Sequence, residues 1–442
     1  MKQTIFALAS AQGRAGVSII RISGDRAIMA LADLTTKTLT PRLATYVPLI
    51  YKGEHIDDAV VLWFKGPHSF TGEDCVELHV HGSKAVLDRL YEVLTDLGLV
   101  LAQPGEFSRR GVENGKFDLT QAEAIADLVD AECEAQRQQA LMQLGGGLKQ
   151  QYEAWRSDLI DILARIEVYI DFPDDDLPAD LNEALLARIA SLEIALTDAI
   201  ADSHRGRQIR EGYRIVILGE PNAGKSSLFN ALLKAEAAIV TPIAGTTRDV
   251  LEAQLRIGPY SVLLYDTAGL RDTDEVVEAE GIRRARARGH EADLRLWIID
   301  STKPALPDDF RAGDLMVFNK IDQADLEARE AIDHLRVSRE TSLFIVSVTT
   351  GEGLAALTST LEAIVSAQLS VQSFPAATRL RHIERLTESR DQLAIARQSR
   401  LSVPELAAEN IRSAVNSFEA LFGRYDVEGV LDVIFSSFCI GK

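Results

Sequence analysis

The stretch G-E-P-N-A-G-K-S at 219–226 is a pattern that binds phosphate groups. It matches G-x-x-x-x-G-K-[ST] and stands between a buried strand expected at 213–218 and a helix expected at 227–234. Backbone N–H groups of such a loop point at an anion, Lys225 reaches the β- and γ-phosphates, and the Ser226 hydroxyl ligates Mg²⁺. A nucleoside triphosphate is therefore the expected ligand. The expected contacts in this loop are Asn222, Ala223, Gly224, Lys225, Ser226 and Ser227.

Two further segments carry ligands for the same magnesium ion. D-T-A-G at 266–269 follows a strand expected at 261–265, so Asp266 would hold Mg²⁺ through water and the Gly269 N–H would sense the γ-phosphate. In A-G-T-T-R-D at 244–249, Thr247 is the candidate for the second hydroxyl ligand, and a flexible polar turn is the alternative interpretation. The expected nucleotide contacts here are Gly245, Thr246, Thr247, Asp266, Thr267, Ala268 and Gly269.

The motif N-K-I-D at 319–322 follows a strand expected at 315–318 and predicts which base is bound. The Asp322 carboxylate can accept from both N1–H and the 2-amino group of guanine, whereas adenine offers no such donor pair. The aliphatic stem of Lys320 would flank the ring. Asn319 belongs to the same motif, and backbone near Ser347, after a strand expected at 343–348, would contact the base. The four motifs in this order predict GTP as the substrate.

Hydrolysis needs a group that orients water, and the sequence leaves several candidates. Many small GTPases place a glutamine where this chain has Leu270, which cannot form a hydrogen bond. An arginine finger, either Arg271 or Arg248, is one substitute. A monovalent cation is another, because the Asn222 oxygen and the carbonyls of 241–247 are ligands that suit potassium.

Glu278 could polarise the attacking water through a bridging water, and Lys225 and Thr247 would act with it. The alternative interpretation is that Glu278 is one solvated carboxylate among several on a helix face. Its acidic neighbours are Asp272, Asp274, Glu275 and Glu280.

The pattern along the chain predicts a multidomain protein of α/β and α elements. We expect an N-terminal α+β domain at 1–116, a helical domain in two halves at 117–210 and 369–442, and a doubly wound GTPase domain inserted at 211–368. Long helical stretches are expected at 119–144 and 148–170, with another near 182–203. Insertion is compatible with folding because the two ends of an inserted domain usually lie close together.

Composition restricts the remaining classes. A net charge of −19 argues against a protein that coats nucleic acid nonspecifically. The cysteines Cys75, Cys133 and Cys439 are too widely spaced for a zinc or disulfide framework. The N-terminal apolar run is short and reads as a strand, and no run of about 18 apolar residues could span a membrane. We therefore expect a cytoplasmic protein without a membrane partner.

Motifs outside the nucleotide site resemble those of the tRNA-modification GTPases called MnmE or TrmE, along essentially the whole chain. The ending Cys-x-Gly-Lys is especially specific for that family. The matching stretches are T-I-F-A-L-A at 4–9, R-I-S-G at 21–24, F-T-G-E-D at 70–74, H-G at 81–82, P-G-E-F-S-R-R at 104–110, N-G-K-F-D-L at 114–119 and C-I-G-K at 439–442.

The resemblance implies roles that the residues alone do not establish. Glu278 matches the catalytic glutamate of the family. Cys439 matches its cysteine near the folate region, although a small buried thiol is a competing interpretation. The resemblance implies that Asn222, Thr241, Ile243 and Thr246 belong to the GTP site and coordinate K⁺. It also implies that Arg21, Glu77, Lys116 and Lys442 bind a formyl- or methylene-tetrahydrofolate, whose carboxylates suit cationic partners.

The family resemblance also implies partners and a product. Members are homodimers that form a heterotetramer with the FAD protein MnmG (GidA). Together they install an aminomethyl or carboxymethylaminomethyl group at carbon 5 of the wobble uridine of certain tRNAs, and GTP hydrolysis drives a conformational change. The alternatives are a ribosome-assembly or RNA-binding GTPase switch and a folate enzyme that GTP only regulates. The neutral and acidic flanks disfavour the former, because such switches usually carry a basic RNA-binding domain.

Overall fold

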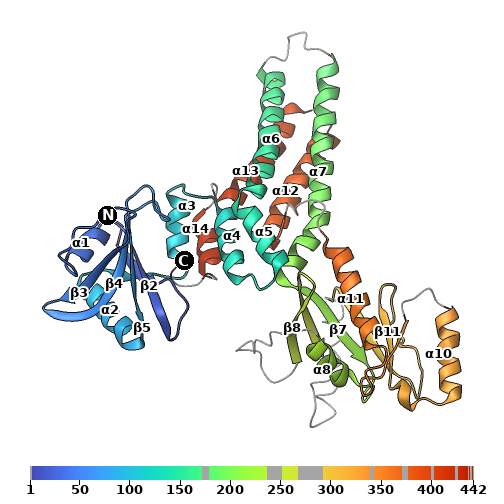
Figure 1. Cartoon of the computed structure of the whole chain (residues 1–442). Coiled ribbons are helices and arrows are strands. Elements are labelled where there is room, and N and C mark those ends of the chain that lie inside the picture. The colour runs from blue at the N-terminus through green and yellow to red at the C-terminus, as the bar shows by residue number, and fades with distance from the viewer. Residues whose placement is uncertain are drawn as a thin grey trace, which may run out of the picture. The chain divides into compact units, whose positions relative to one another are not determined.

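A computed structural model gives the structure of the chain. It describes residues 2–171, 179–235, 251–266, 292–338, 343–370, 377–399, 403–423, 427–436, 438 and 441. The chain divides into two compact units, each made of separate stretches of sequence (Figure 1). Unit 1 comprises Met1–Ala126, Gln143–Ile194 and Glu384–Lys442, and unit 2 comprises Asp127–Met142 and Ala195–Ile383.

Unit 1 begins with a six-stranded sheet in the order β3-β4-β5-β2-β1-β6, as expected for an α+β domain. One face of this sheet packs against helices α1 (Ala27–Ala32) and α2 (Lys84–Asp96) and forms the core. The Ser83 hydroxyl accepts from the Val86 N–H and so caps the start of α2. The strands are β1 (Ile5–Leu8), β2 (Ala15–Ser23), β3 (Thr45–Tyr51), β4 (Glu54–Phe64), β5 (Cys75–Gly82) and β6 (Val100–Leu101).

The strand register places a row of side chains on the other face of this sheet. Tyr46 pairs with Val60, Val60 with His79, and His79 with Ile19. Successive residues of a strand alternate between faces, so this row points away from the core residues that flank it in sequence. Tyr46 is 60% exposed and Val60 is 38% exposed. The second face therefore presents apolar surface.

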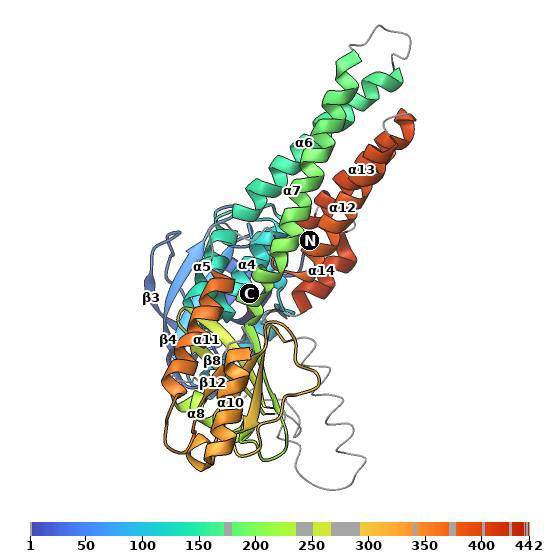
Figure 2. The same cartoon turned by 90° about the vertical axis from the view of Figure 1, so that its right-hand side faces the viewer.

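The parts of four long helices that belong to unit 1 lie along one another (Figure 2). The fully buried Tyr152 packs its ring edge-on against Phe418 and Phe422, and this contact joins α6 to α13. An ion pair between Arg397 and Glu193 at 2.7 Å joins α12 to α7. The helices are α6 (Gly147–Asp171), α7 (Ala179–Glu211), α12 (Leu380–Gln398) and α13 (Pro404–Phe422). Three shorter helices complete the unit, namely α3 (Glu106–Glu113), α4 (Leu119–Asp130) and α14 (Val427–Ser436).

The helical stretch expected at 119–144 is interrupted. Helix α4 ends at Asp130 and α5 (Glu134–Leu144) begins four residues later. The side-chain oxygen of Gln136 accepts the N–H groups of Glu132 and Cys133 at 2.9 and 3.2 Å, and so satisfies donors at the start of the new helix. Helix α7 also begins earlier and ends later than the helix expected near 182–203.

Unit 2 contains a second six-stranded sheet, in the order β12-β11-β10-β7-β9-β8. Neighbouring strands are parallel except at one edge, where β8 runs antiparallel to β9. The strands are β7 (Tyr213–Gly219), β8 (Leu251–Ile257), β9 (Tyr260–Asp266), β10 (Leu294–Asp300), β11 (Leu315–Asn319) and β12 (Leu343–Ile345). Strand β12 is shorter than the strand expected at 343–348.

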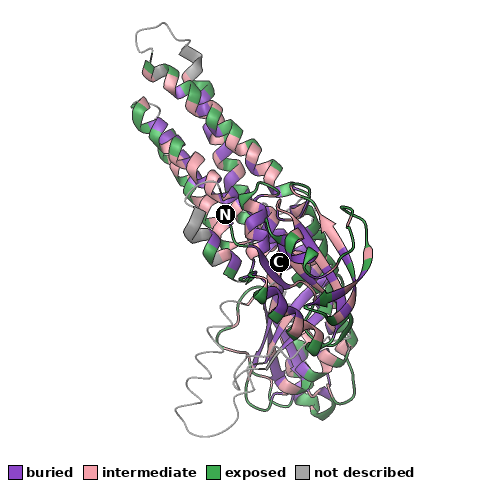
Figure 3. Ribbon diagram, turned by 90° about the vertical axis from the view of Figure 1, so that its left-hand side faces the viewer, coloured by how far each residue is buried: buried purple, intermediate pink, exposed green. Residues whose placement is uncertain are grey.

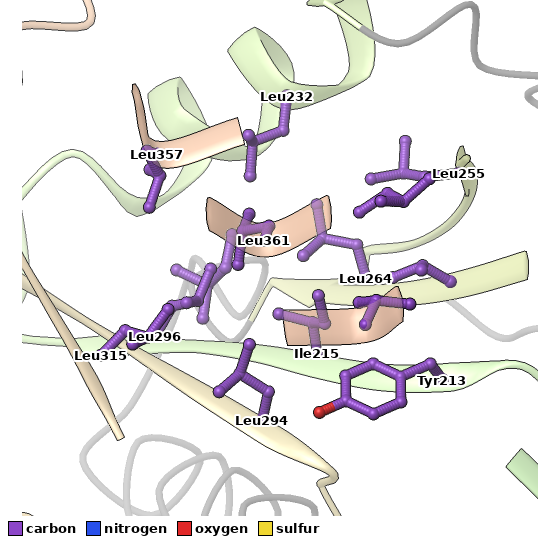
Figure 4. Packing of buried hydrophobic residues seen from close by; sticks show 14 of the residues in the cluster. Tyr213, Ile215, Leu232, Leu255, Leu264, Leu294, Leu296, Leu315, Leu357 and Leu361 are labelled. Carbon is purple, nitrogen blue, oxygen red and sulfur yellow. The ribbon is translucent and has the colours of Figure 1, made fainter. Parts of the chain in front are cut away.

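Helices cover both faces of this sheet, which makes it doubly wound. On one face, α8 (Lys225–Ala235) and α11 (Leu354–Leu369) bury leucines such as Leu232 and Leu361 against the strand residues Ile215 and Leu264 (Figure 4). On the other face, Ile332 of α10 (Leu326–Ser338) packs with Met316 and Phe318. Buried residues follow the strands and the facing sides of the helices (Figure 3). No described helix is long and apolar enough to cross a membrane.

Candidate functional site

The phosphate loop links the end of β7 to the start of α8, as the sequence predicts. Lys225 is the first residue of α8, and its ammonium donates to the carbonyl oxygens of Gly219 at 2.9 Å and Glu220 at 2.8 Å. The side chain is buried, and this burial lowers the pKa of Lys225, while the carboxylates of Asp266 and Glu220 oppose the shift. The loop therefore already encloses a positive charge at a helix N-terminus, where an anion is favoured.

Asp266 ends the strand next to the phosphate loop. Its backbone pairs with Ile217 in the parallel ladder, so its fully buried carboxylate lies near the end of β7 and interacts electrostatically with the Lys225 ammonium. Ser226 follows Lys225 on α8 and is half-buried. Ser226 and Asp266 are the two predicted magnesium ligands within the described residues. Ser226 lies in the first turn of α8, and Asp266 lies at the end of β9, the strand that neighbours β7.

The base motif packs directly against the phosphate loop. The side-chain amide of Asn319 donates to the carbonyl oxygen of Ala223 at 3.0 Å, and its oxygen accepts the Val348 N–H at 3.2 Å. Gly224 has φ +100°, and a Cβ there would collide with the Asn319 amide. Glycine at 224 is therefore required both by backbone conformation and by this close approach.

Asp322 and Ser347, the other two predicted base contacts, follow the ends of the adjacent strands β11 and β12. Asp322 is exposed in a short 3-10 helix, η1 (Ile321–Gln323), that follows β11. Ser347 is fully buried, and its hydroxyl accepts the Thr350 N–H at 3.2 Å, which fixes the loop after β12. The Val346 N–H donates to the Phe318 carbonyl at 2.8 Å, so the two base-contacting loops start from adjacent strand ends.

Lys320 is held by a partner that the sequence analysis did not identify. Its ammonium donates to the Asn222 carbonyl oxygen at 2.7 Å and to the Asp300 carboxylate at 2.6 Å. Asp300 ends β10 just as Asp266 ends β9. An aspartate closing a buried strand next to the base motif is the sequence signal that could have pointed to it.

Part of the predicted machinery lies outside the described residues. This holds for the segment around the second magnesium hydroxyl, for most of D-T-A-G and for the candidate catalytic glutamate. The predicted site residues concerned are Thr241, Ile243, Gly245, Thr246, Thr247, Thr267, Ala268, Gly269 and Glu278, together with Lys442, Cys439 and the alternatives Arg248 and Arg271.

A second polar site lies on the sheet of unit 1. The Arg21 guanidinium donates to Glu77 Oε1 through Nε at 3.1 Å and through its terminal nitrogen at 2.9 Å. It also lies over the rings of Phe70 and Phe107, with its central carbon 5.4 and 5.8 Å from the ring centres. Such positions stabilise a cation by interaction with the aromatic face.

Gly441 lies at the same place. Arg21 donates to the Gly441 carbonyl oxygen at 3.5 Å, and a Cβ on Gly441 would collide with the Leu8 carbonyl. Nearby, His79 Nε2 is buried, approaches a Glu77 carboxylate oxygen at 3.4 Å and has no hydrogen-bond partner among the described residues. A buried polar atom left in this way fits a site that a polar ligand completes. The site therefore joins residues from both ends of the chain.

Lys116, the third predicted folate residue within the described chain, is exposed and donates to the Pro67 carbonyl at 2.7 Å. Its stem lies close to Gly72, in the same F-T-G-E-D loop that brings Phe70 to Arg21. Among the described residues, no direct contact joins Lys116 to Arg21 or Glu77.

Two family models together match most of the chain. The family model for the GTP-binding protein TrmE N-terminus matches residues 4–116, and the model for the MnmE helical domain matches residues 119–439. A crystal structure of Aquifex aeolicus Era bound to GDP and AlF4⁻ is 25% identical, covers 40% of this chain and 66% of that chain, and has a TM-score of 0.29.

Two curated relatives carry the name tRNA modification GTPase MnmE. The protein from Caulobacter vibrioides is 48% identical over 446 residues, and that from Phenylobacterium zucineum is 47% identical over 454 residues. Both alignments cover 100% of this chain and 100% of the relative. With the phosphate loop and the base motif in direct contact, the chain belongs to the MnmE (TrmE) family of tRNA modification GTPases.

Proposed function

We propose that this GTPase is activated by potassium and works with the FAD-dependent protein MnmG (GidA). Together they would install an aminomethyl or carboxymethylaminomethyl group at carbon 5 of the wobble uridine of certain tRNAs, with GTP hydrolysis driving a conformational change. The observation that carries the proposal is the hydrogen bond from Asn319 to Ala223, which ties the predicted base motif to the predicted phosphate loop. The chain also aligns with its relatives over its full length.

Magnesium would be held at the phosphate end of this frame by the hydroxyls of Ser226 and Thr247 and, through water, by Asp266. Hydroxyl and carboxylate oxygens are the ligands that Mg²⁺ prefers, and the bound ion would neutralise charge on the phosphates. Lys225 contributes a second positive charge from the chain itself. Thr267, Ala268 and Gly269 would complete this side of the pocket.

Potassium would bind beside the loop through Asn222, Thr241, Ile243 and Thr246. Asn222 is exposed and has φ +62°, a left-handed conformation that asparagine tolerates better than most residues. Glu278 would polarise the attacking water. This arrangement takes the place of the glutamine that Leu270 cannot supply.

A formyl- or methylene-tetrahydrofolate would bind on the sheet of unit 1. The chemistry of the side chains fits such a ligand, because Arg21, Lys116 and Lys442 are cations suited to its carboxylates and Glu77 can accept from its ring N–H groups. The partly buried ring of Phe70 would supply a flat apolar wall for the pterin, whereas Phe107 is fully buried and lies against the Arg21 guanidinium. The contacts of Arg21 with Phe70 and Phe107 support this location for the ligand.

The same sheet face would join two copies of the chain into a homodimer. Tyr46 and Val60 are exposed on it, in a register row that continues through His79 to Ile19, beside Arg21 and Glu77. Burial of such apolar surface favours association. A Val60→Glu variant should shift the molecular mass in solution towards the monomer, and an unchanged mass would contradict this interface.

The proposed domains are the folate-binding and dimerisation domain at 1–116, the helical domain at 117–210 and 369–442, and the GTPase domain at 211–368. We infer that the proposed reaction takes place in the cytoplasm.

The test of the proposed function is an analysis of wobble-uridine nucleosides by mass spectrometry after the gene is removed. The modified nucleoside should disappear and return with the intact gene, but not with a Lys225→Ala variant. Capture of an FAD-containing partner by the tagged chain would support the MnmG assignment. If the modified nucleoside persists after the gene is removed, and ribosome assembly is defective instead, the alternative GTPase switch would be favoured.

A further inference from the structure

Two residues of the nucleotide site share an uncommon backbone conformation. Asn222 has φ +62° and Lys320 has φ +65°, and both belong to the four described residues other than glycine with positive φ. The Lys320 ammonium donates to the Asn222 carbonyl oxygen at 2.7 Å, so one hydrogen bond joins them. Left-handed residues other than glycine cost free energy and persist where surrounding contacts fix them.

Asp300 supplies such a contact. One carboxylate oxygen, Oδ1, accepts from the backbone N–H of Thr302 at 3.0 Å and from its hydroxyl at 2.8 Å. The other oxygen, Oδ2, accepts from the Lys320 ammonium at 2.6 Å. The carboxylate is thus anchored by its own loop on one side and holds the lysine on the other.

The sheet fixes the position of Asp300 relative to the base motif. Asp300 pairs with Asn319 in the parallel ladder between β10 and β11, and the Ser301 N–H donates to the Asn319 carbonyl at 2.8 Å. The ion pair is also partly shielded, with side-chain exposures of 27% for Lys320 and 28% for Asp300. A charge-assisted hydrogen bond in such a place is stronger than one between exposed groups.

Protonation of Asp300 follows the same geometry. Partial burial raises the pKa of Asp300, but hydrogen bonds from Lys320 and from both donors of Thr302 outweigh it and lower the pKa below its ordinary value. The carboxylate therefore stays charged near neutral pH.

We infer that Asp300 is a positioning residue that acts through Lys320 on the phosphate loop. It would hold the ammonium against the Asn222 carbonyl and so fix both the wall of the guanine pocket and the direction of the Asn222 side chain. The expected effect of Asp300 on potassium dependence rests on the proposed function, in which Asn222 binds potassium. The expected effect of Asp300 on nucleotide release requires only that the chain binds guanine nucleotides.

The deciding variant is Asp300→Asn. The amide oxygen of the new asparagine can still accept from Thr302, but the substitution removes the negative charge that holds Lys320. In full-length protein with Mg²⁺, release of a fluorescent methylanthraniloyl-GDP should become about tenfold faster, which corresponds to 1.4 kcal/mol. The potassium concentration for half-maximal GTPase activity should rise several-fold, while kcat at saturating potassium stays within about twofold of wild type.

Thr302→Val is the matched control. It removes one hydrogen bond to the other oxygen of Asp300 and leaves the ion pair to Lys320, so both measured quantities should stay within about twofold of wild type. Asp300→Glu, which keeps the charge, should recover part of the retention. Thermal unfolding of each variant would show whether the fold is kept.

A double-mutant cycle separates this role from a general effect on stability. In a Lys320→Ala background, Asp300→Asn should add little to the release rate. Unchanged release in Asp300→Asn, or a full additional effect without Lys320, would overturn the inference. If wild-type activity does not respond to potassium, the cation part of the proposed function is wrong, and GDP release still decides the role of Asp300.

Discussion

Asn319 and Ala223 are 96 positions apart in the sequence, yet the side-chain amide of one donates to the carbonyl oxygen of the other at 3.0 Å. This bond joins the motif predicted to read the base to the loop predicted to hold the phosphates. Because Asn319 also accepts from Val348, its position is fixed from two sides. The predicted phosphate loop and the predicted base motif are therefore fixed relative to each other by Asn319.

Base selection should depend on the carboxylate of Asp322. In an Asp322→Asn variant, one of the two carboxylate oxygens that would accept from guanine becomes an NH2 donor. We expect GTP affinity to fall by about 2 kcal/mol or more, while xanthosine triphosphate binds better because its C2 carbonyl can accept from that donor. Calorimetric titration with both nucleotides measures this exchange. Glu327→Gln, an exposed charge change on the adjacent helix, is the control. If the Asp322→Asn variant binds GTP as tightly as the wild type, Asp322 does not recognise the guanine base.

Turnover should depend on Glu278. Glu278→Ala should bind GTP as wild type does but hydrolyse it about a hundredfold more slowly, because the attacking water loses its polarising group. Single-turnover hydrolysis measures the chemical step. Glu280→Ala serves as the control, since it removes a neighbouring carboxylate. Equal loss in both variants, or none in Glu278→Ala, would support the solvated-carboxylate interpretation.

The wild-type chain should hydrolyse GTP at least several-fold faster in potassium than in sodium at equal ionic strength. An Asn222→Gly variant keeps the left-handed conformation but lacks the side-chain oxygen, so its rate should lose the dependence on potassium. Initial rates across a series of alkali chlorides test both statements. Equal rates in sodium and potassium for the wild type would restore an arginine finger as the explanation.

Folate binding should require Arg21. An Arg21→Ala variant removes the cation between Phe70 and Phe107, so its affinity for 5-formyltetrahydrofolate should fall about tenfold or more, with GTP affinity unchanged. Arg89→Ala is the control, because Arg89 lies on α2, which covers the opposite face of the sheet. Unchanged folate affinity in Arg21→Ala would place the ligand elsewhere.

Local patterns made much of the nucleotide site predictable. The phosphate loop and N-K-I-D each depend on a strand, a turn and a helix that are contiguous in sequence, and these elements are found near the expected positions. An aspartate at the end of a buried strand marks Asp300 as a candidate, but its contact with Lys320 depends on the register of β10 against β11, which no local pattern encodes. Likewise, the contact of Arg21 with Gly441 joins residues 420 positions apart.

The helical parts were predictable in type but less so in extent. Apolar spacing indicates a continuous helix across 119–144, yet the helix is interrupted between α4 and α5. The capping of Glu132 and Cys133 by Gln136 is one cause. Another is the contact of the following Ala135 N–H with the Pro259 carbonyl at 3.0 Å, in the turn between β8 and β9. Such tertiary contacts override helical periodicity.

Titration calorimetry of the pure chain with Mg²⁺ and either GTP or ATP tests the central claim most directly. The account predicts measurable heat and one site per chain for GTP, and binding of ATP weaker by a few kcal/mol. No heat for GTP, or equal affinity for ATP, would contradict a site in which Asp322 reads the base while the loop at 219–226 holds the phosphates.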